Sequence, residues 1–293
     1  MEKKNLNMKM RRQCSERRKA KEPMQDNRDG CSCGYSNENN SNVCMAHVFD
    51  NNCYFTQRPD CTNRLGHSPL QKMMAAIRVF GYGCCFDSVD EVIKIGGSSV
   101  RGATMEFCET IIRVYKKQYL RDPTPDDISR ILIENKAHVF SEMIGSFDCM
   151  HWRWDAYPIA WQGQYNGRYN YLTLILEAAA SQDLWIRHAF FGMPGTNSDV
   201  TILDHLPLFD KYMNGTTPPV EYEVNGSVYN LPYYLIDKIY PKHAILMQAI
   251  RNPVTAKEQT FTTLQEACRK NIERAFGVLQ QKWRVLCVPV RLE

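Results

Sequence analysis

The stretch Met143-Ile-Gly-Ser-Phe-Asp-Cys-Met150 decides the fold, because it is a short apolar run with one carboxylate inside it. Such a run after a helical region predicts a buried β-strand. A carboxylate in a buried strand is strongly unfavourable unless it is paired or bound to a cation. Asp148 is therefore either a structural residue that ends its strand or a member of a charged site.

Further elements follow this strand in an order that indicates the fold class. The predicted elements are two strands, Tyr169 to Ser181 and Leu184 to Phe191, a helix from Asn197 or Ser198, a strand Tyr233 to Ile236, and an amphipathic helix Leu264 to Trp283. Strand, strand, strand, helix, strand, helix is typical of an α/β domain with a central mixed sheet flanked by helices. We expect this domain to span residues 137–293.

Two more acidic residues lie at half-buried positions of the predicted domain. Asp237 closes the fourth strand, and Glu273 lies beside the apolar stripe of the last helix. Mg²⁺ takes oxygen ligands, and two such ions activate a nucleophile and stabilise a leaving oxygen in phosphodiester cleavage. Each acid also has a structural alternative, which for Glu273 is pairing with Arg269 or Lys270 on its own helix. The interval between Asp237 and Glu273 leaves room for one additional helix.

Residues 44–136 are predicted to be helical. Ser68 is a helix cap, a short segment from Ser88 to Ile95 follows, and a third helix begins at Ser98 or Ser99. Three short helices with a glycine turn before the last suit a helix-turn-helix module, although helical trios are also common as purely structural elements. The third helix carries the candidate DNA contacts, which are Arg101, Arg113, Lys116 and Lys117.

Residues 1–43 are first basic and then rich in Asn, Ser and Asp, so we expect them to be disordered. The basic arm is either a nuclear-import signal or phosphate contact, or a solvated tail. The formal net charge of +4 permits binding to a polyanion without requiring it. No apolar run predicts a membrane span, and no secretory signal is recognisable.

Cysteines early in the chain raise the alternative of a zinc-dependent module. His47 and His67 lie near these cysteines. The spacing of the cysteines is irregular, however, and no Cys-x-x-Cys pair occurs among them. The cysteines concerned are Cys31, Cys33, Cys44, Cys53 and Cys61.

Three weaker candidates remain. His151 is a candidate accessory residue near Asp148, with a strand-end histidine satisfied by backbone as the alternative. Asp199 lies in the first turn of a predicted helix, where the macrodipole already favours a negative charge. An aromatic cluster with Arg153 among it either stacks on nucleobases or packs at the domain edge. Its members are Trp152, Trp154, Tyr157 and Trp161.

The sequence resembles the PIF/Harbinger transposase-derived nucleases, in particular the plant DDE endonuclease-like copies. The resemblance rests on collinear blocks that run from about Ser68 almost to the end of the chain. These blocks are Gly145–Trp152, Ala160–Tyr165, Leu176–Trp185, His188–Asp199, Tyr233–Pro241 and Ile272–Gln280.

The resemblance implies an RNase H-like catalytic domain whose metal ligands are Asp148, Asp237 and Glu273, with two Mg²⁺ or Mn²⁺ ions. It keeps Asp199 as an outer ligand, and it implies an upstream helix-turn-helix region, a nuclear setting, DNA as substrate and a Myb-like DNA-binding partner protein. The alternative is a catalytically idle, domesticated transposase that binds DNA or chromatin.

Departures from the family pattern favour that alternative. Lys238 follows the second acid where the family has Gly or Ser, so we expect it to compete for Asp237. Asn271 replaces an acid, and the chain ends at Glu293 without the helix that normally closes the domain, so we expect a C-terminally shortened domain.

Overall fold

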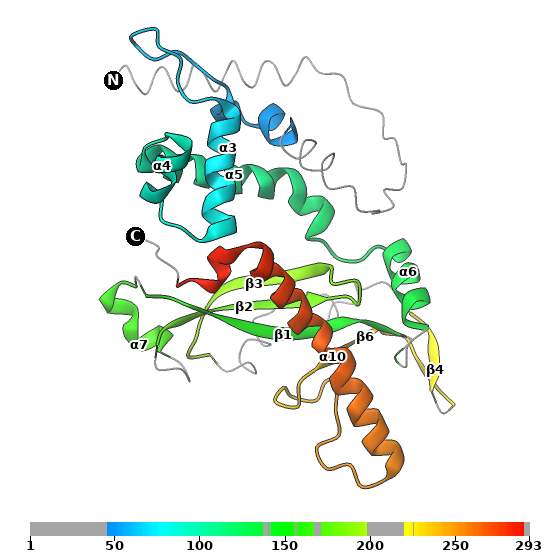
Figure 1. The fold of residues 1–293 in the computed structure, drawn as a ribbon. Coiled ribbons are helices and arrows are strands. Elements are labelled where there is room, and N and C mark those ends of the chain that lie inside the picture. The colour runs from blue at the N-terminus through cyan, green and yellow to red at the C-terminus, as the bar shows by residue number, and fades with distance from the viewer. Residues whose placement is uncertain are drawn as a thin grey trace.

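The computed structural model describes residues 46–136, 140, 142–155, 157–166, 171–197, 220–224 and 226–289. In Figure 1 the helices α3, α4 and α5 lie above a β-sheet, and the long helix α10 crosses one face of that sheet. The predicted tail 1–43, the helix expected from Asn197 or Ser198, and Asp199 lie outside the described residues, apart from Asn197 itself.

The helical region follows local sequence signals closely. Its elements are η1 (Cys53–Phe55), α3 (Pro69–Tyr82), η2 (Asp87–Val89), α4 (Asp90–Ile93), α5 (Gly97–Tyr119) and α6 (Pro125–Lys136). Ser68 caps α3 in a capping box with Gln71, as its position before Pro69 predicts. Gly83 ends α3 in the left-handed conformation with φ of 63°, a conformation that glycine adopts without steric cost. Helix α5 begins at Gly97, slightly earlier than predicted.

The sheet has five strands in the order β3-β2-β1-β6-β7. These strands are β1 (Met143–Arg153), β2 (Thr173–Ala180), β3 (Ile186–Pro194), β6 (Tyr233–Ile236) and β7 (Leu246–Gln248). Strands β1, β2 and β3 pair antiparallel, whereas β6 pairs parallel with both β1 and β7. The predicted α/β class with a central mixed sheet is therefore confirmed.

Helix α10 (Ala256–Lys282) buries an apolar stripe on one face of this sheet. Ile272 and Phe276 pack with Ala178 and Ala180 of β2. The opposite face carries a second cluster that includes Phe147, Ile175 and Ile236. The sheet is apolar on both faces, so it forms the centre of the domain.

Some elements differ from those predicted. A two-stranded hairpin, β4 (Tyr222–Val224) and β5 (Ser227–Tyr229), precedes β6. Between Asp237 and Glu273 the structure has β7 and the first part of α10, so the additional helix for which this interval leaves room is absent there. Helix α10 begins well before Leu264 because Thr255 and Glu258 form a capping box. Its first turns are mostly polar, so apolar spacing alone does not locate their start.

The helical region and the sheet are joined at two places. Trp185 Nε1, just before β3, donates to the Tyr119 carbonyl oxygen at the end of α5, at 2.9 Å. Near the C-terminus, Trp152 Nε1 donates to the Val288 carbonyl oxygen at 2.8 Å. That segment, after η4 (Arg284–Cys287), also approaches Gly83 of the helical region closely.

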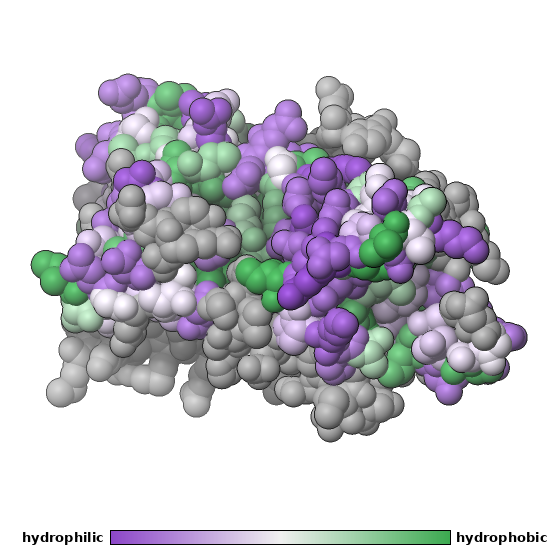
Figure 2. All heavy atoms as spheres, turned by 90° about the horizontal axis from the view of Figure 1, so that it is seen from below, coloured by the Kyte–Doolittle hydropathy of each residue, from purple (hydrophilic) through white to green (hydrophobic). Residues whose placement is uncertain are grey.

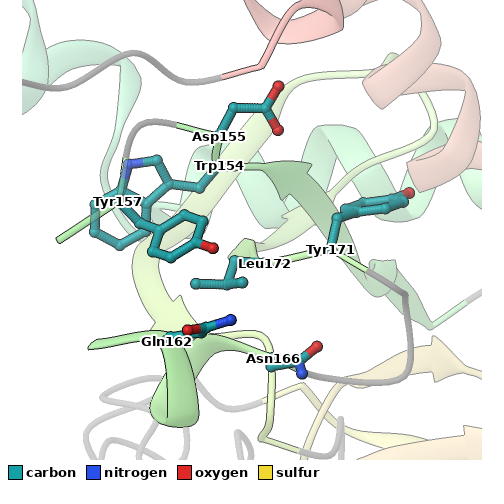
Figure 3. A pocket seen from close by; sticks show the side chains of 7 residues that line it. All are labelled: Trp154, Asp155, Tyr157, Gln162, Asn166, Tyr171 and Leu172. Atoms are coloured by element: carbon teal, nitrogen blue, oxygen red, sulfur yellow. The ribbon is translucent and has the colours of Figure 1, made fainter. Parts of the chain in front are cut away.

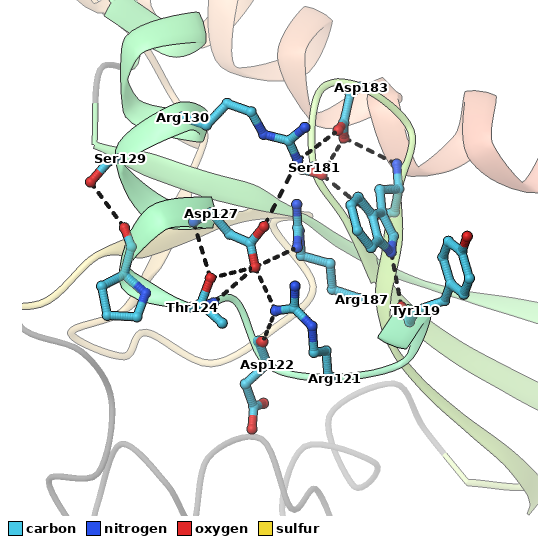
Figure 4. A network of polar contacts seen from close by, with 12 residues as sticks. Tyr119, Arg121, Asp122, Thr124, Asp127, Ser129, Arg130, Ser181, Asp183 and Arg187 are labelled. Atoms are coloured by element: carbon cyan, nitrogen blue, oxygen red, sulfur yellow. Dashed lines mark hydrogen bonds and ion pairs between the residues drawn. The ribbon is translucent and has the colours of Figure 1, made fainter. Parts of the chain in front are cut away.

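A network of charges reinforces the first junction. Figure 4 shows Asp127 of α6 among three arginines. Its carboxylate lies 2.5 Å from Arg121, 3.5 Å from Arg187 and 4.0 Å from Arg130. Arg187 belongs to β3, so this carboxylate connects α6 to the sheet.

On the face seen in Figure 2, hydrophilic residues predominate among those that the structure describes, and hydrophobic residues form small separate patches. In the part of the chain that the structure describes, no helix is long and apolar enough to cross a membrane.

Candidate active site

The site is built on alternate residues of β1 that face α10. The Ser146 hydroxyl donates to the Cys268 carbonyl oxygen at 3.2 Å, and Met150 Sδ accepts from Gln280 Nε2 at 3.3 Å. Asp148 lies between them, and its carboxylate accepts from Arg269 Nη1 at 3.1 Å. Since side chains alternate along a strand, Asp148 points into the interface between β1 and α10.

Asp237 directly follows the neighbouring parallel strand β6. The register pairs Ser146 with Leu235. Continuing this register by two residues on each strand places Asp237 next to Asp148. Leu235 packs with Leu264 and Cys268 of α10, so alternation directs Asp237 toward the same face. Asp237 Oδ1 accepts the Lys238 backbone N–H at 2.7 Å.

Glu273 reaches the same place from α10. Arg269 Nη2 lies 2.9 Å from Glu273 Oε1, and Arg269 Nη1 lies 3.1 Å from Asp148 Oδ2. A single guanidinium thus bridges Asp148 of β1 and Glu273 of α10. The side chains of Arg269 and Asp148 are 15% and 23% exposed and that of Glu273 is 45% exposed, so the Asp148 end of the bridge is the better shielded from water.

The acids also act on one another electrostatically. Burial raises the pKa of Asp148 above its ordinary value, whereas the Cys149 backbone N–H and Arg269 lower it. The negative charges of Glu273 and Asp237 raise this pKa as well. Three carboxylates with mutual repulsion need a compensating cation, which Arg269 provides for two of them.

The donor set fits a hard divalent cation chemically, because Asp148, Asp237 and Glu273 offer carboxylate oxygens alone. Among the residues described, however, no three His, Cys, Asp or Glu side chains form a group that could hold a metal ion as they stand. The position between Asp148 and Glu273 is taken by Arg269. Binding of a metal by all three acids therefore requires that Arg269 move.

The residues that depart from the family pattern have other roles than those expected. Lys238 Nζ pairs with Glu266 Oε1 of α10 at 2.6 Å, and this contact draws its charge toward α10. The expected competitor for Asp237 is thus held by another carboxylate. Asn271 is buried and accepts from Arg274 Nη1 at 2.7 Å.

His151 does not join the three acids. It is three residues beyond Asp148 on β1, so it points to the opposite face of the sheet. Its Nδ1 lies 3.0 Å from the Thr173 hydroxyl on β2. A fully buried carboxylate, Glu177, also lies on that face, opposite Cys149, with His188 Nε2 at 3.2 Å.

Sequence reasoning missed Gln265, which positions the site. Its side chain is fully buried, and Nε2 donates to the Ile236 carbonyl oxygen at 2.9 Å and to the Met247 carbonyl oxygen at 3.0 Å. It thereby fixes α10 to the end of β6, immediately before Asp237. A signal was present, because Gln265, Arg269 and Glu273 recur every four residues beside the apolar stripe of α10.

The predicted DNA contacts are all exposed on α5, and most of the cysteines of the zinc alternative lie outside the described residues. The predicted contacts are Arg101, Arg113, Lys116 and Lys117, and Arg113 Nη2 also donates to the hydroxyl of the buried Thr110 at 3.0 Å. Cys53 and Cys61 are exposed. The other cysteines of the zinc alternative, Cys31, Cys33 and Cys44, lie outside the described residues.

Comparison with known proteins identifies the family. A family profile described as "Plant transposon protein" matches residues 117–292. The chain belongs to the plant transposon protein family. The match covers all three acids and every strand of the sheet, so it confirms the transposon-derived origin that the sequence blocks indicate. No curated protein and no solved structure matches the chain.

Proposed function

We propose that this member of the plant transposon protein family is a metal-dependent endonuclease of the PIF/Harbinger type that cleaves DNA phosphodiester bonds. One observation carries the proposal. Asp148 of β1, Asp237 after β6 and Glu273 of α10 face one another at the same interface, although they are far apart in the sequence. All three lie within the family match.

The arrangement of the sheet supports an RNase H-like domain. Counted without the hairpin, the strands follow the spatial order third, second, first, fourth, fifth. The first three are antiparallel and the last two are parallel additions. An RNase H-like domain has a mixed sheet of this kind, with acids on its two central strands, here β1 and β6.

In the proposed reaction the three carboxylates would hold Mg²⁺ or Mn²⁺, and the DNA phosphate would enter between β1 and α10. Two divalent ions, when bound, lower the pKa of a water and neutralise charge that develops on the phosphate. Asp148 and Asp237 have fixed positions, because β1 and β6 are paired and Gln265 holds the strand end. Arg269, once released from Asp148, would be free to contact two oxygens of that phosphate bidentately.

Cleavage of supercoiled plasmid tests this proposal. The purified full chain is incubated with Mg²⁺ or Mn²⁺, beside the Asp148→Asn and Asp237→Asn variants. We expect nicking that requires metal and falls at least about a hundredfold in both variants, since each removes a ligand charge. The matched control is Glu134→Gln, which removes an exposed carboxylate of α6, away from the three acids, and should keep full activity. Equal nicking by Asp148→Asn and the unchanged chain would refute the proposal.

A second candidate function is DNA or chromatin binding without catalysis. The Arg269 bridge favours it, because a protein cation already occupies the position between Asp148 and Glu273 and offsets part of their negative charge. This candidate predicts no metal-dependent nicking and no rise in Tm with Mg²⁺, together with a salt-sensitive gel shift that persists in the acid variants. For either function we propose a nuclear location and a Myb-like partner protein, on the basis of the family resemblance.

A further inference from the structure

A pocket with an aromatic wall lies at the far end of β1, apart from the acids. It is formed between the end of β1 and the start of β2, beside η3 (Ile159–Trp161) and α7 (Gln162–Tyr165). Its volume is about 260 Å³. This is below the roughly 300–1,000 Å³ of pockets for drug-sized ligands, so the pocket suits one flat ring system.

One aromatic side chain of the pocket wall is more exposed than packing requires. Trp154 is buried and forms the base of the cluster, with Trp161 at 5.9 Å in an edge-to-face arrangement. Trp161 does not line the pocket, and its ring stacks on Tyr165 at 6.0 Å. Tyr171 does line the pocket and is 40% exposed. Packing at the domain edge therefore explains Trp154 and Trp161 but leaves the Tyr171 ring partly open at the pocket. Exposed π-faces at a hollow are what a stacking ligand requires.

Polar groups around the rings supply directional contacts. Figure 3 shows the amides of Gln162 and Asn166 on one side of the pocket and the carboxylate of Asp155 on the other. Amides present a donor and an acceptor side by side, which matches the edge of a nucleobase. Arg153 Nε bonds Asp155 at 2.6 Å, and the guanidinium lies 5.1 Å from the centre of the Tyr171 ring. Arg153 thus holds the Tyr171 ring in position at the edge of the pocket.

We propose that this pocket binds one unpaired nucleobase of the DNA substrate. The base is unpaired because only a base outside the duplex stack exposes both a face and an edge. Trp154 is six residues beyond Asp148 on the same strand course, about 20 Å at 3.3 Å per residue. The bound nucleotide therefore lies several positions from the phosphate at the acids. The inference rests on the proposed function only in taking DNA as the ligand.

Short labelled single strands test the pocket directly. Fluorescence anisotropy compares a dT pentamer, a dC pentamer and an abasic pentamer, which keeps the phosphates and lacks bases, on the full chain without divalent metal. We expect the better of the two base-bearing strands to bind about five- to a hundredfold tighter than the abasic one, the range of one base–aromatic stack. Tyr171→Ala should remove most of this difference.

Tyr82→Ala is the matched control for that variant. Tyr82 is 63% exposed on α3 and also has an arginine, Arg78, over its ring at 4.9 Å. It should keep the full preference for base-bearing strands. If Tyr171→Ala fails to fold, Gln162→Ala replaces it, because Gln162 is exposed. This variant should reduce the difference in affinity between the dT and dC pentamers.

Two results would overturn the proposal: equal affinity for the abasic and base-bearing strands, or an equal loss in Tyr82→Ala and Tyr171→Ala. The Asp148→Asn variant separates this proposal from the proposed nuclease activity. Its preference for base-bearing strands should be unchanged even where nicking is absent, because Asp148 does not line the pocket.

Discussion

Arg269 gives Asp148 and Glu273 the positive charge that a divalent metal would otherwise supply. Its two contacts, at 3.1 Å and 2.9 Å, satisfy one oxygen of each carboxylate. An internal cation of this kind stabilises the folded chain without metal, because three clustered acids would otherwise repel one another. The same contacts oppose metal binding, since the ion and the guanidinium need the same oxygens.

Removal of Arg269 should therefore move stability and metal response in opposite directions. We expect Arg269→Gln to lower the free energy of unfolding without metal by about 1–3 kcal/mol, mainly because the partly buried Asp148 carboxylate loses its partner. The rise in Tm on adding Mg²⁺ should be larger in this variant than in the unchanged chain. Thermal unfolding with and without Mg²⁺ measures both effects.

The control for this prediction is Lys270→Gln, which removes a cation from the next, exposed position of α10. It should leave both quantities nearly unchanged. A Tm of Arg269→Gln equal to that of the unchanged chain, with or without Mg²⁺, would mean that the bridge contributes nothing.

The candidate acids were predictable residue by residue, whereas their relation to one another was not. An acid inside or directly after an apolar strand is visible in the sequence, as for Asp148 and Asp237. The contact between Arg269 and Asp148 depends on which residues of α10 pack against which residues of β1, and no local sequence pattern determines this packing. The four-residue spacing allows Glu273 to pair with Arg269 on the same helix, and this ion pair is present in the structure.

At the level of elements, β1 depends on a close approach to β2. A Cβ on Gly145 would lie 2.6 Å from the Ala180 carbonyl oxygen, and this oxygen belongs to the backbone of the paired strand. We expect Gly145→Ala to destabilise the fold by about 1–3 kcal/mol, because the strands must separate to admit the methyl group. Urea unfolding measures the loss.

Gly277→Ala is the paired control, because nothing lies within 4 Å of its added Cβ on the exposed side of α10. Alanine is favoured over glycine in a helix by about 0.5–1 kcal/mol, so this variant should be more stable than the unchanged chain. A stabilising effect of Gly145→Ala would contradict the close approach.

The contact between α6 and the sheet through Asp127 should make the stability of the fold depend on pH. Burial raises the pKa of Asp127, but hydrogen bonds from Arg121 and Thr124 and the charge of Arg187 outweigh it and lower the pKa to about 2. The ordinary value is 3.8, so the unfolded chain takes up this proton first as pH falls. The stabilisation is therefore complete above about pH 4 and is lost as pH falls from about 4 to about 2.

Urea midpoints across this pH range test the junction. Asp127→Asn should be less stable than the unchanged chain at pH 6, and the difference should shrink toward pH 2. Asp126→Asn, at the preceding exposed position, should show a much smaller difference at pH 6. A gap for Asp127→Asn that stays constant from pH 6 to pH 2 would exclude the carboxylate as its cause.

The elements that sequence predicts best are those with their own periodicity or caps. Strand β6 has the predicted bounds, Tyr233–Ile236, because four buried apolar residues end at a charge. Strand β7 has only three residues and depends on pairing with β6, so its sequence carries no alternation of its own. The hairpin β4–β5 is likewise short and partly polar, and its position depends on tertiary contacts.

Over the whole molecule, the three proposed catalytic acids and the exposed basic residues of α5 belong to different regions. Helices α3 to α5 lie above the sheet, and the start of α10 points away from them (Figure 1). The contacts of Trp152 and Trp185 fix the sheet to the C-terminal segment and to the end of α5. A duplex held by α5 would then have a defined orientation relative to Asp148.

This arrangement predicts how salt affects DNA binding. Lys116 and Lys117 are exposed in the last turn of α5. If both contact phosphates, the double variant Lys116→Gln/Lys117→Gln should reduce the slope of log K against log salt by about 2, because each lost contact removes about 0.9. Affinity should fall for every duplex sequence alike. Lys257→Gln, at the opposite end of the fold in the first turn of α10, should leave the slope unchanged. An unchanged slope in the double variant would show that this part of α5 does not meet the DNA backbone.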